Sequence, residues 1–75
     1  MDIGSTCFYC VVVPNSGTYE CEELTIRTVG DSYYVGVNVK TKQAMMFTPS
    51  MIGTYVFNNR YEAVEALKEF RGKND

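Results

Sequence analysis

Only one stretch of this chain has the spacing of an amphipathic helix, and it lies near the C-terminal end, over residues 60–71. Its apolar side chains recur at intervals of three and four residues, and they are Ala63, Ala66, Leu67 and Phe70. Asn59 precedes the stretch as a candidate N-cap, with Glu62 three residues later, and Gly72 follows as a candidate left-handed terminator. The sequence therefore predicts one C-terminal helix whose apolar stripe packs on the rest of the chain.

The rest of the chain has the pattern of short β-strands separated by turn residues. The clearest strand is the segment 33–40, in which Val35, Val37 and Val39 share one face, and we expect that face to meet the core. Turn-forming residues occupy the segments 14–17 and 30–32. The predicted strands cover residues 7–13, 18–29, 33–40, 44–48 and 53–57.

The segment 18–29 has apolar residues that change face part-way along. Tyr19 and Cys21 have one parity, whereas Leu24 and Ile26 have the other. A bulge near Glu22 and Glu23 would reconcile the two halves. Alternatively, the strand begins only in the second half of the segment, and the first half is a loop.

Strands first and a helix last indicate an α+β fold. We expect an antiparallel β-meander of four or five strands with one C-terminal α-helix packed on one face. Seventy-five residues, of which 45% are hydrophobic and 21% charged, suit a single domain over residues 1–75 with a thin core. One helix covers one face of such a sheet, so the other face is the predicted place for a partner.

Charge and cysteine content limit the classes of protein to which the chain can belong. The net charge is -2, with neither sign gathered into a run, so attraction to a phosphate backbone is not indicated. No stretch approaches the ~20 apolar residues of a membrane span, and the N-terminal residues lack the pattern of a secretory signal. Three cysteines also differ from the even sets of small secreted scaffolds. We expect a cytoplasmic protein that does not enter a membrane.

Cys7 and Cys10 have the spacing found in zinc knuckles and redox motifs, but they lie in a strand-forming run. On a strand they point to opposite faces, with α-carbons roughly 10 Å apart. The chain has no histidine to complete a zinc site, and no helix start follows that would activate a thiol. We therefore expect no metal, no cofactor and at least one cysteine in the core. Cys10 and Cys21 are cross-strand neighbours if the first hairpin pairs, and whether they form a disulfide stays open.

The absence of histidine also removes the commonest general base and the usual partner of a nucleophile. Glu22 and Glu23 are adjacent, so on a strand they face opposite ways and cannot act together on one bond. We do not expect an enzyme.

The leading interpretation is a small non-enzymatic protein-binding module that acts stoichiometrically on a larger protein. Rigid aromatic side chains and adaptable thioethers anchor protein interfaces, and the candidate partner-binding residues of these types are Tyr33, Tyr34, Met46 and Met51. A homodimer through a sheet edge or face is another use of the same surface.

A nucleic-acid or nucleotide binder is the alternative, with Tyr33, Tyr34, Arg27 and Lys40 on the exposed sheet face, although the acidic balance makes nucleic acid a less favoured partner. No family motif is present. In size and style, as a few strands with a capped helix, the chain is similar to small phage-encoded proteins that bind and inhibit host enzymes or defence complexes. That resemblance implies a larger host protein as the partner.

Overall fold

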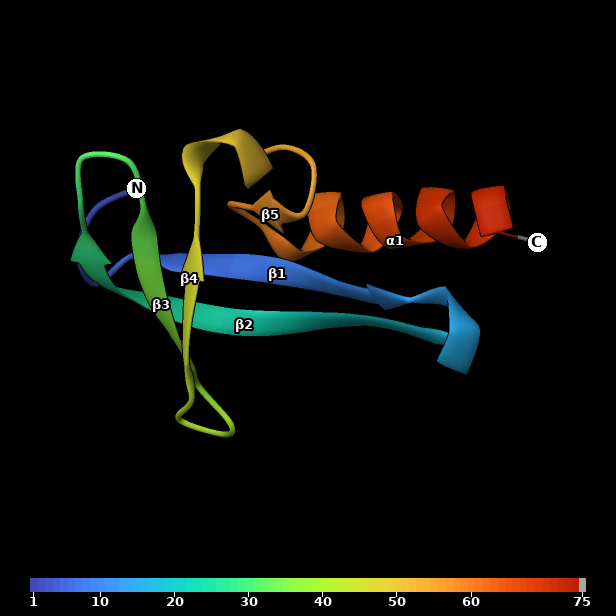
Figure 1. The fold of residues 1–75 in the computed structure, drawn as a ribbon, viewed down its shortest axis with the longest axis horizontal. Helices are drawn as coiled ribbons and strands as arrows, with labels where there is room; N and C mark the ends of the chain where they lie inside the picture. Colours follow the sequence, from blue (N-terminus) through green and yellow to red (C-terminus); the bar gives the residue numbers. More distant parts are fainter. Residues whose placement is uncertain (75) are drawn as a thin grey trace.

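The computed structural model describes residues 1–74, and it has the five-stranded antiparallel sheet and C-terminal helix of the predicted α+β fold (Figure 1). The strands are β1 (Thr6–Val13), β2 (Thr18–Val29), β3 (Tyr34–Asn38), β4 (Ala44–Phe47) and β5 (Val56–Phe57), and the helix is α1 (Arg60–Asn74). Short 3₁₀ helices, Pro14–Ser16 and Pro49–Met51, follow β1 and β4. No helix within residues 1–74 is long and apolar enough to cross a membrane.

The first four strands form a meander, and β5 lies outside that order. The sheet order is β4-β3-β2-β1-β5, so the chain crosses from one edge to the other after β4. At the far edge, Phe8 pairs with Phe57 and Tyr9 with Val56. The crossing segment also packs Met51 and Ile52 against the sheet core. The chain's own connection therefore covers part of the face that the sequence left open.

Both faces of the sheet are buried, at different places along β2. The helix-side core consists of Cys10, Ala63 and Leu67, with Tyr19 and Cys21 packed against it. The far-side core consists of Cys7, Leu24, Ile26, Phe47 and Val56. This two-sided burial explains the change of parity in β2, which pairs with β1 in an unbroken register from residue 18 to residue 25.

The bulge expected at residues 22–23 is therefore absent from the β1–β2 pairing, and the alternative of a loop in the first half of β2 is also wrong. A register shift does occur further along, between Ile26 and Thr28, where β2 pairs with β3. A bulge increases the local twist of a strand. Figure 1 shows β3 and β4 crossing the long β1–β2 pair steeply at this end, while α1 lies along the other end.

The valine face of the third strand does not meet the core, contrary to the sequence prediction. Gly36 and Asn38 are buried, and Val35 and Val37 are only half-buried on the opposite face. The cause is the close approach of β3 to β2: a β-carbon on Gly36 would lie 3.0 Å from the β-carbon of Leu24. The large Leu24 side chain fills the space on the core face, and glycine leaves room for it.

Three strands are shorter than predicted: β4 ends one residue before the end of the segment 44–48, and β3 and β5 fall further short of the segments 33–40 and 53–57. β3 ends at Asn38, because its side-chain oxygen accepts hydrogen bonds from the backbone amides of Lys40 and Thr41, which turns the chain away. β5 begins only at Val56, because Gly53 adopts a left-handed φ of 90° in the preceding turn.

The N-terminal end of α1 is as predicted, whereas its C-terminal end is not. The side-chain oxygen of Asn59 accepts a hydrogen bond from the amide of Glu62 at 2.8 Å, which is an N-cap. Gly72 lies inside the helix and not at its end, and it is not among the left-handed glycines of the described residues. Glycine lowers helix stability by about 1 kcal/mol but does not force a helix to stop.

Candidate functional site

The longest strand of the sheet has a neighbour on only one side over part of its length. β1 pairs with β2 from Thr18 onward, but β3 pairs with β2 only from Leu24 onward. Within residues 1–74, no strand borders residues 18–22 on the side away from β1. We call this part of β2 the open edge.

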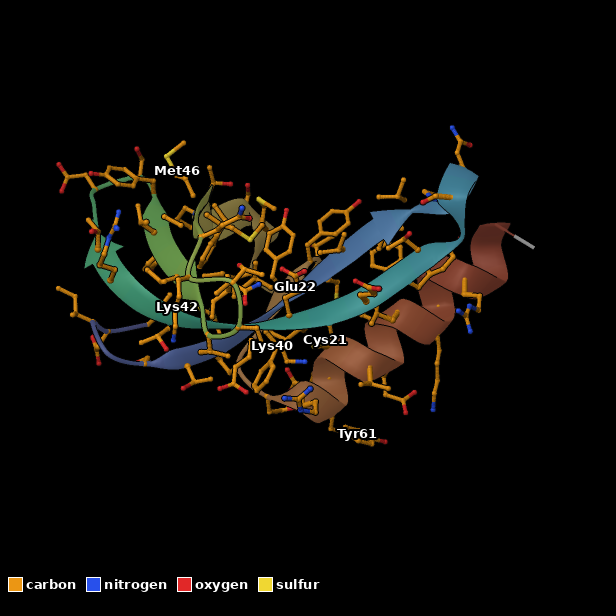
Figure 2. The ribbon with its side chains drawn as sticks, turned by 90° about the horizontal axis from the view of Figure 1, so that it is seen from below. Cys21, Glu22, Lys40, Lys42, Met46 and Tyr61 are labelled. Carbon is orange, nitrogen blue, oxygen red and sulfur yellow. The ribbon has the colours of Figure 1, made fainter. Side chains whose placement is uncertain are left out.

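A cleft of about 450 Å³ lies along the open edge, between β2, the end of β3 and the first residue of α1. β2 contributes Cys21 and three glutamates to its wall, the end of β3 contributes Asn38, and Lys40 follows on the turn. Figure 2 shows Cys21, Glu22 and Lys40 gathered where the β3–β4 turn approaches β2. We call this space the edge cleft.

Alternate main-chain groups of the open edge, those of Tyr19 and Cys21, point away from β1. The amide of Cys10 donates to the carbonyl of Tyr55 at 2.7 Å, on the β5 side. Cys10 and Cys21 are directly opposite in the β1–β2 register. Because the amide of Cys10 points to β5 and not to β2, the two residues form a non-hydrogen-bonded pair. The N–H and C=O of Cys21 therefore point away from β1.

A second hydrogen bond supports this direction. The amide of Val39 donates to the carbonyl of Glu23 at 3.1 Å, so the main chain of Glu23 also points away from β1. Because the pattern alternates along a strand, the main chain of Tyr19 has the same direction. Tyr19 and Cys21 thus present donors and acceptors at the open edge.

The open edge exists because Asn38 ends β3. Asn38 is buried, with 5% of its surface exposed, and its side-chain nitrogen donates to a carboxylate oxygen of Glu22 at 2.7 Å. Its side-chain oxygen accepts the amide hydrogens of Lys40 at 2.8 Å and Thr41 at 3.1 Å. One side chain therefore stops the strand, shapes the turn and ties that turn to β2.

The two faces of the open edge differ in chemistry. Glu20 and Glu22 point to one face by the alternation of the strand, and Tyr19 and Cys21 point to the other, beside α1. Arg60 approaches Glu23 at 3.2 Å, and the two side chains are 59% and 36% exposed, so this ion pair contributes little to stability. In the edge cleft, Glu20 and Glu22 lie on one face of β2, and Cys21 lies on the other face with the Glu23–Arg60 ion pair, while Lys40 lines the cleft from the turn.

The thiols beside the open edge are protonated at neutral pH. Burial raises the pKa of Cys10 to about 11, and the neighbouring Cys21 adds to the rise. Burial also raises the pKa of Cys21, while Arg60 opposes this shift and the nearby glutamates add to it. The Cys10 thiol donates to the carbonyl of Ala63 at 3.4 Å, within the helix-side core.

Cys7 and Cys10 point to opposite faces of β1, as the sequence predicted. Cys7 belongs to the far-side core and Cys10 to the helix-side core, and both are almost completely buried. Among residues 1–74, no group of three or more histidine, cysteine or acidic side chains is placed to hold a metal ion.

The four candidate partner-binding residues lie in different surroundings. Tyr34 stacks on Phe47 with ring centroids 5.4 Å apart, and both Tyr34 and Met51 pack against the far-side core. Met46 is 70% exposed and points from the opposite face of β4, and Figure 2 shows it well away from Cys21. Tyr33 is exposed, and its ring occupies the space beside Gly30.

The open edge was not predicted from the sequence, although one signal for it was available. The predicted second strand, 18–29, is longer than the predicted third strand, 33–40, and a meander that pairs unequal strands leaves part of the longer one without a neighbour. No family model, curated protein or solved structure matches the chain. The evidence for a function therefore comes from the geometry of the open edge and the edge cleft.

Proposed function

We propose that this chain is a non-catalytic protein-binding module that takes up an extended segment of a larger protein as an additional strand beside β2. The observation that supports the proposal is the open edge, where the N–H and C=O groups of Tyr19 and Cys21 point away from β1 and Cys21 lines the edge cleft. Extended peptides bind to such edges through main-chain hydrogen bonds. The incoming strand would continue along β2 from the point where β3 leaves it.

The side chains around the open edge specify the kind of peptide. A strand added here places alternate side chains beside Glu20 and Glu22 on one face and beside Tyr19 and Cys21 on the other. Opposite charges in neighbouring strands contribute about 0.2–1 kcal/mol per pair. The fitting ligand is an extended segment that alternates basic and apolar residues.

A second copy of this chain fits the open edge less well. The symmetric pairing that sets Tyr19 of one copy opposite Cys21 of the other places the two Glu20 side chains directly opposite each other. Like charges in that position are destabilising. Charge therefore favours a basic partner over a homodimer at this edge.

Within residues 1–74, the β4 edge also has no neighbouring strand, but β4 has only four residues, and its Met46 side chain is exposed. The nucleic-acid alternative gains no support from Tyr34, whose ring stacks on Phe47. The cytoplasmic location and the larger host partner expected from the sequence stay predictions.

An NMR titration of the ¹⁵N-labelled chain tests the proposal. The probe is a six-residue peptide of alternating valine and lysine, capped at both ends. We expect saturable shifts of the Tyr19 and Cys21 amide signals at one peptide per chain. A peptide of alternating valine and glutamate should bind more weakly, because it opposes Glu20 and Glu22.

A backbone-modified peptide separates strand addition from simple charge attraction. N-methylation of the alternate nitrogens that face β2 removes the donors but keeps the side chains and the charge. We expect this peptide to lose binding. Equal binding by both peptides, or shifts confined to β4 or to the outer face of α1, would refute strand addition at β2.

A further inference from the structure

We infer that Cys10 and Cys21 form a dithiol pair that closes reversibly to an intramolecular disulfide by exchange with a small disulfide such as oxidised glutathione. The inference rests on the pairing of β1 with β2 and does not depend on strand addition at the open edge. Both thiols are free in the reduced chain.

The register of the hairpin brings the two cysteines within bonding range. Cys10 lies directly opposite Cys21, and both side chains point to the α1 face. Because the amide of Cys10 bonds to Tyr55, the pair is of the non-hydrogen-bonded type, in which side chains approach closely. The α-carbons of such pairs are about 4.5 Å apart. Disulfides occur at α-carbon separations of about 4.4–6.8 Å, so the bond can form without moving the strands.

Cys7 is excluded from this chemistry by its position. It pairs with Leu24 and lies in the far-side core, on the opposite face of the sheet from Cys10 and Cys21. Its α-carbon is roughly 10 Å from that of Cys10 along the strand, beyond the reach of a disulfide. The native chain can therefore form one of the three possible cysteine pairs.

The accessibility of the two thiols to a small disulfide determines which cysteine reacts first. Cys21 is half-buried and lines the edge cleft, whereas Cys10 is almost completely buried beneath α1. The Cys21 thiolate attacks one sulfur of the small disulfide, forms a mixed disulfide and releases the first small thiolate. The Cys10 thiolate then attacks the Cys21 sulfur and releases the second. Two electrons pass to the small disulfide, and its two thiolates take up the two cysteine protons.

The closed bond constrains the hairpin. It links the two strands across the turn that contains Pro14 and Gly17, and Cys10 gives up its contact with the Ala63 carbonyl. Tyr19 and Cys21 keep their outward-facing main-chain groups, because the bond uses side chains only. Because closing a loop of this length restricts the unfolded chain, we expect Tm to rise by about 10–20 °C.

The test is incubation of the reduced, folded chain with oxidised glutathione at mildly alkaline pH, followed by alkylation of free thiols and mass spectrometry. We expect a product that has lost two hydrogen atoms, a peptide map that joins Cys10 to Cys21, and alkylation of Cys7 alone after unfolding. A reducing agent should restore the starting mass. The rise in Tm is a second, independent measurement.

Three variants serve as controls. Cys7→Ala should still form the bridge, Cys21→Ser should form none, and Cys10→Ala should stop at a glutathione adduct on Cys21. A stable adduct on the unaltered chain, a bridge that includes Cys7, or a bridge that forms only in denaturant would each overturn the inference.

Discussion

The side-chain amide of Asn38 donates a hydrogen bond to the carboxylate of Glu22 across 2.7 Å, and this bond joins the last residue of β3 to the open edge of β2. The oxygen of the same side chain accepts the amides of Lys40 and Thr41. Asn38 therefore determines both where β3 stops and where the wall of the edge cleft stands.

Replacement of this residue should destabilise the chain. In Asn38→Ala, the amides of Lys40 and Thr41 and the Glu22 carboxylate lose their partner, and we expect the free energy of unfolding to fall by about 1–3 kcal/mol. Urea unfolding measures the change. Gln43→Ala, on the exposed part of the same turn, is the matched control and should change stability by less than about 0.5 kcal/mol. Equal effects of the two substitutions would contradict the role of Asn38.

Two glycine substitutions should have opposite effects. In Gly36→Ala, the new methyl group meets the β-carbon of Leu24 at 3.0 Å, and we expect a loss of about 1–3 kcal/mol. In Gly72→Ala, the methyl group meets nothing within 4 Å and lies in a helix, so we expect a gain of about 1 kcal/mol. Thermal or urea unfolding measures the sign of the stability change in each variant. A stabilising Gly36→Ala would disprove the close approach of β3 to β2.

Tyr34 and Met46 should respond differently to truncation, although both are candidate partner-binding residues. Tyr34→Ala removes a ring that stacks on Phe47, and we expect a loss of about 2–3 kcal/mol. Met46→Ala removes a side chain that is 70% exposed, and we expect a change within about 0.5 kcal/mol. Tyr34→Phe keeps the ring and should keep most of the stability. A stable Tyr34→Ala variant would show that the ring contributes little to the core.

Stability should fall as the pH rises above 9. Burial raises the pKa of Cys7 and of Cys10 from 9.0 to about 11, so between these values the unfolded chain releases protons that the folded chain retains. The free energy of unfolding then decreases by up to about 1.4 kcal/mol per pH unit for each thiol, and the contribution is complete below pH 9. Urea unfolding from pH 8 to pH 11 measures the slope. The Cys7→Ala variant should have a shallower slope, and an unchanged slope would show that Cys7 does not titrate with a raised pKa.

Reversal of one charge should weaken binding of the basic peptide. Glu20 is exposed and lines the edge cleft, so Glu20→Lys places a positive charge beside the lysines of the alternating peptide. We expect affinity to fall by about threefold to tenfold, since a neighbouring charge pair is worth up to about 1 kcal/mol. Glu69→Lys on α1 makes the same change in net charge away from this cleft. Equal losses in both variants would attribute the effect to net charge and not to the open edge.

Local features of the fold were predictable from the sequence, because neighbouring residues determine them. The cap at Asn59 and the burial of Ala63 and Leu67 follow from helical spacing, and the opposite directions of Cys7 and Cys10 follow from the alternation of a strand. Cys10 lies opposite Cys21 because the turn between β1 and β2 sets the register of the hairpin.

Features that depend on distant parts of the chain were not predictable. The buried face of β3 depends on the close contact between Gly36 and Leu24, and the covering of the far-side core depends on where the segment after β4 crosses the sheet. The candidate site is a part of β2 that no other strand borders within residues 1–74, and the only sequence signal for it was the greater length of the predicted second strand over the third. In the sequence, Glu20 and Glu22 are typical of a solvated surface.

The pairing of β1 with β5 affects how the chain can fold. The hairpin of β1 with β2 is local, because it joins residues 6–13 to residues 18–25. Its second edge and its helix-facing side remain bare until Val56–Phe57 and α1 have been made. Contacts between such distant segments form slowly, because a long loop must close first. The apolar surface of the hairpin therefore stays uncovered until residues 56–74 fold onto it, and transiently exposed apolar surface of this kind favours aggregation.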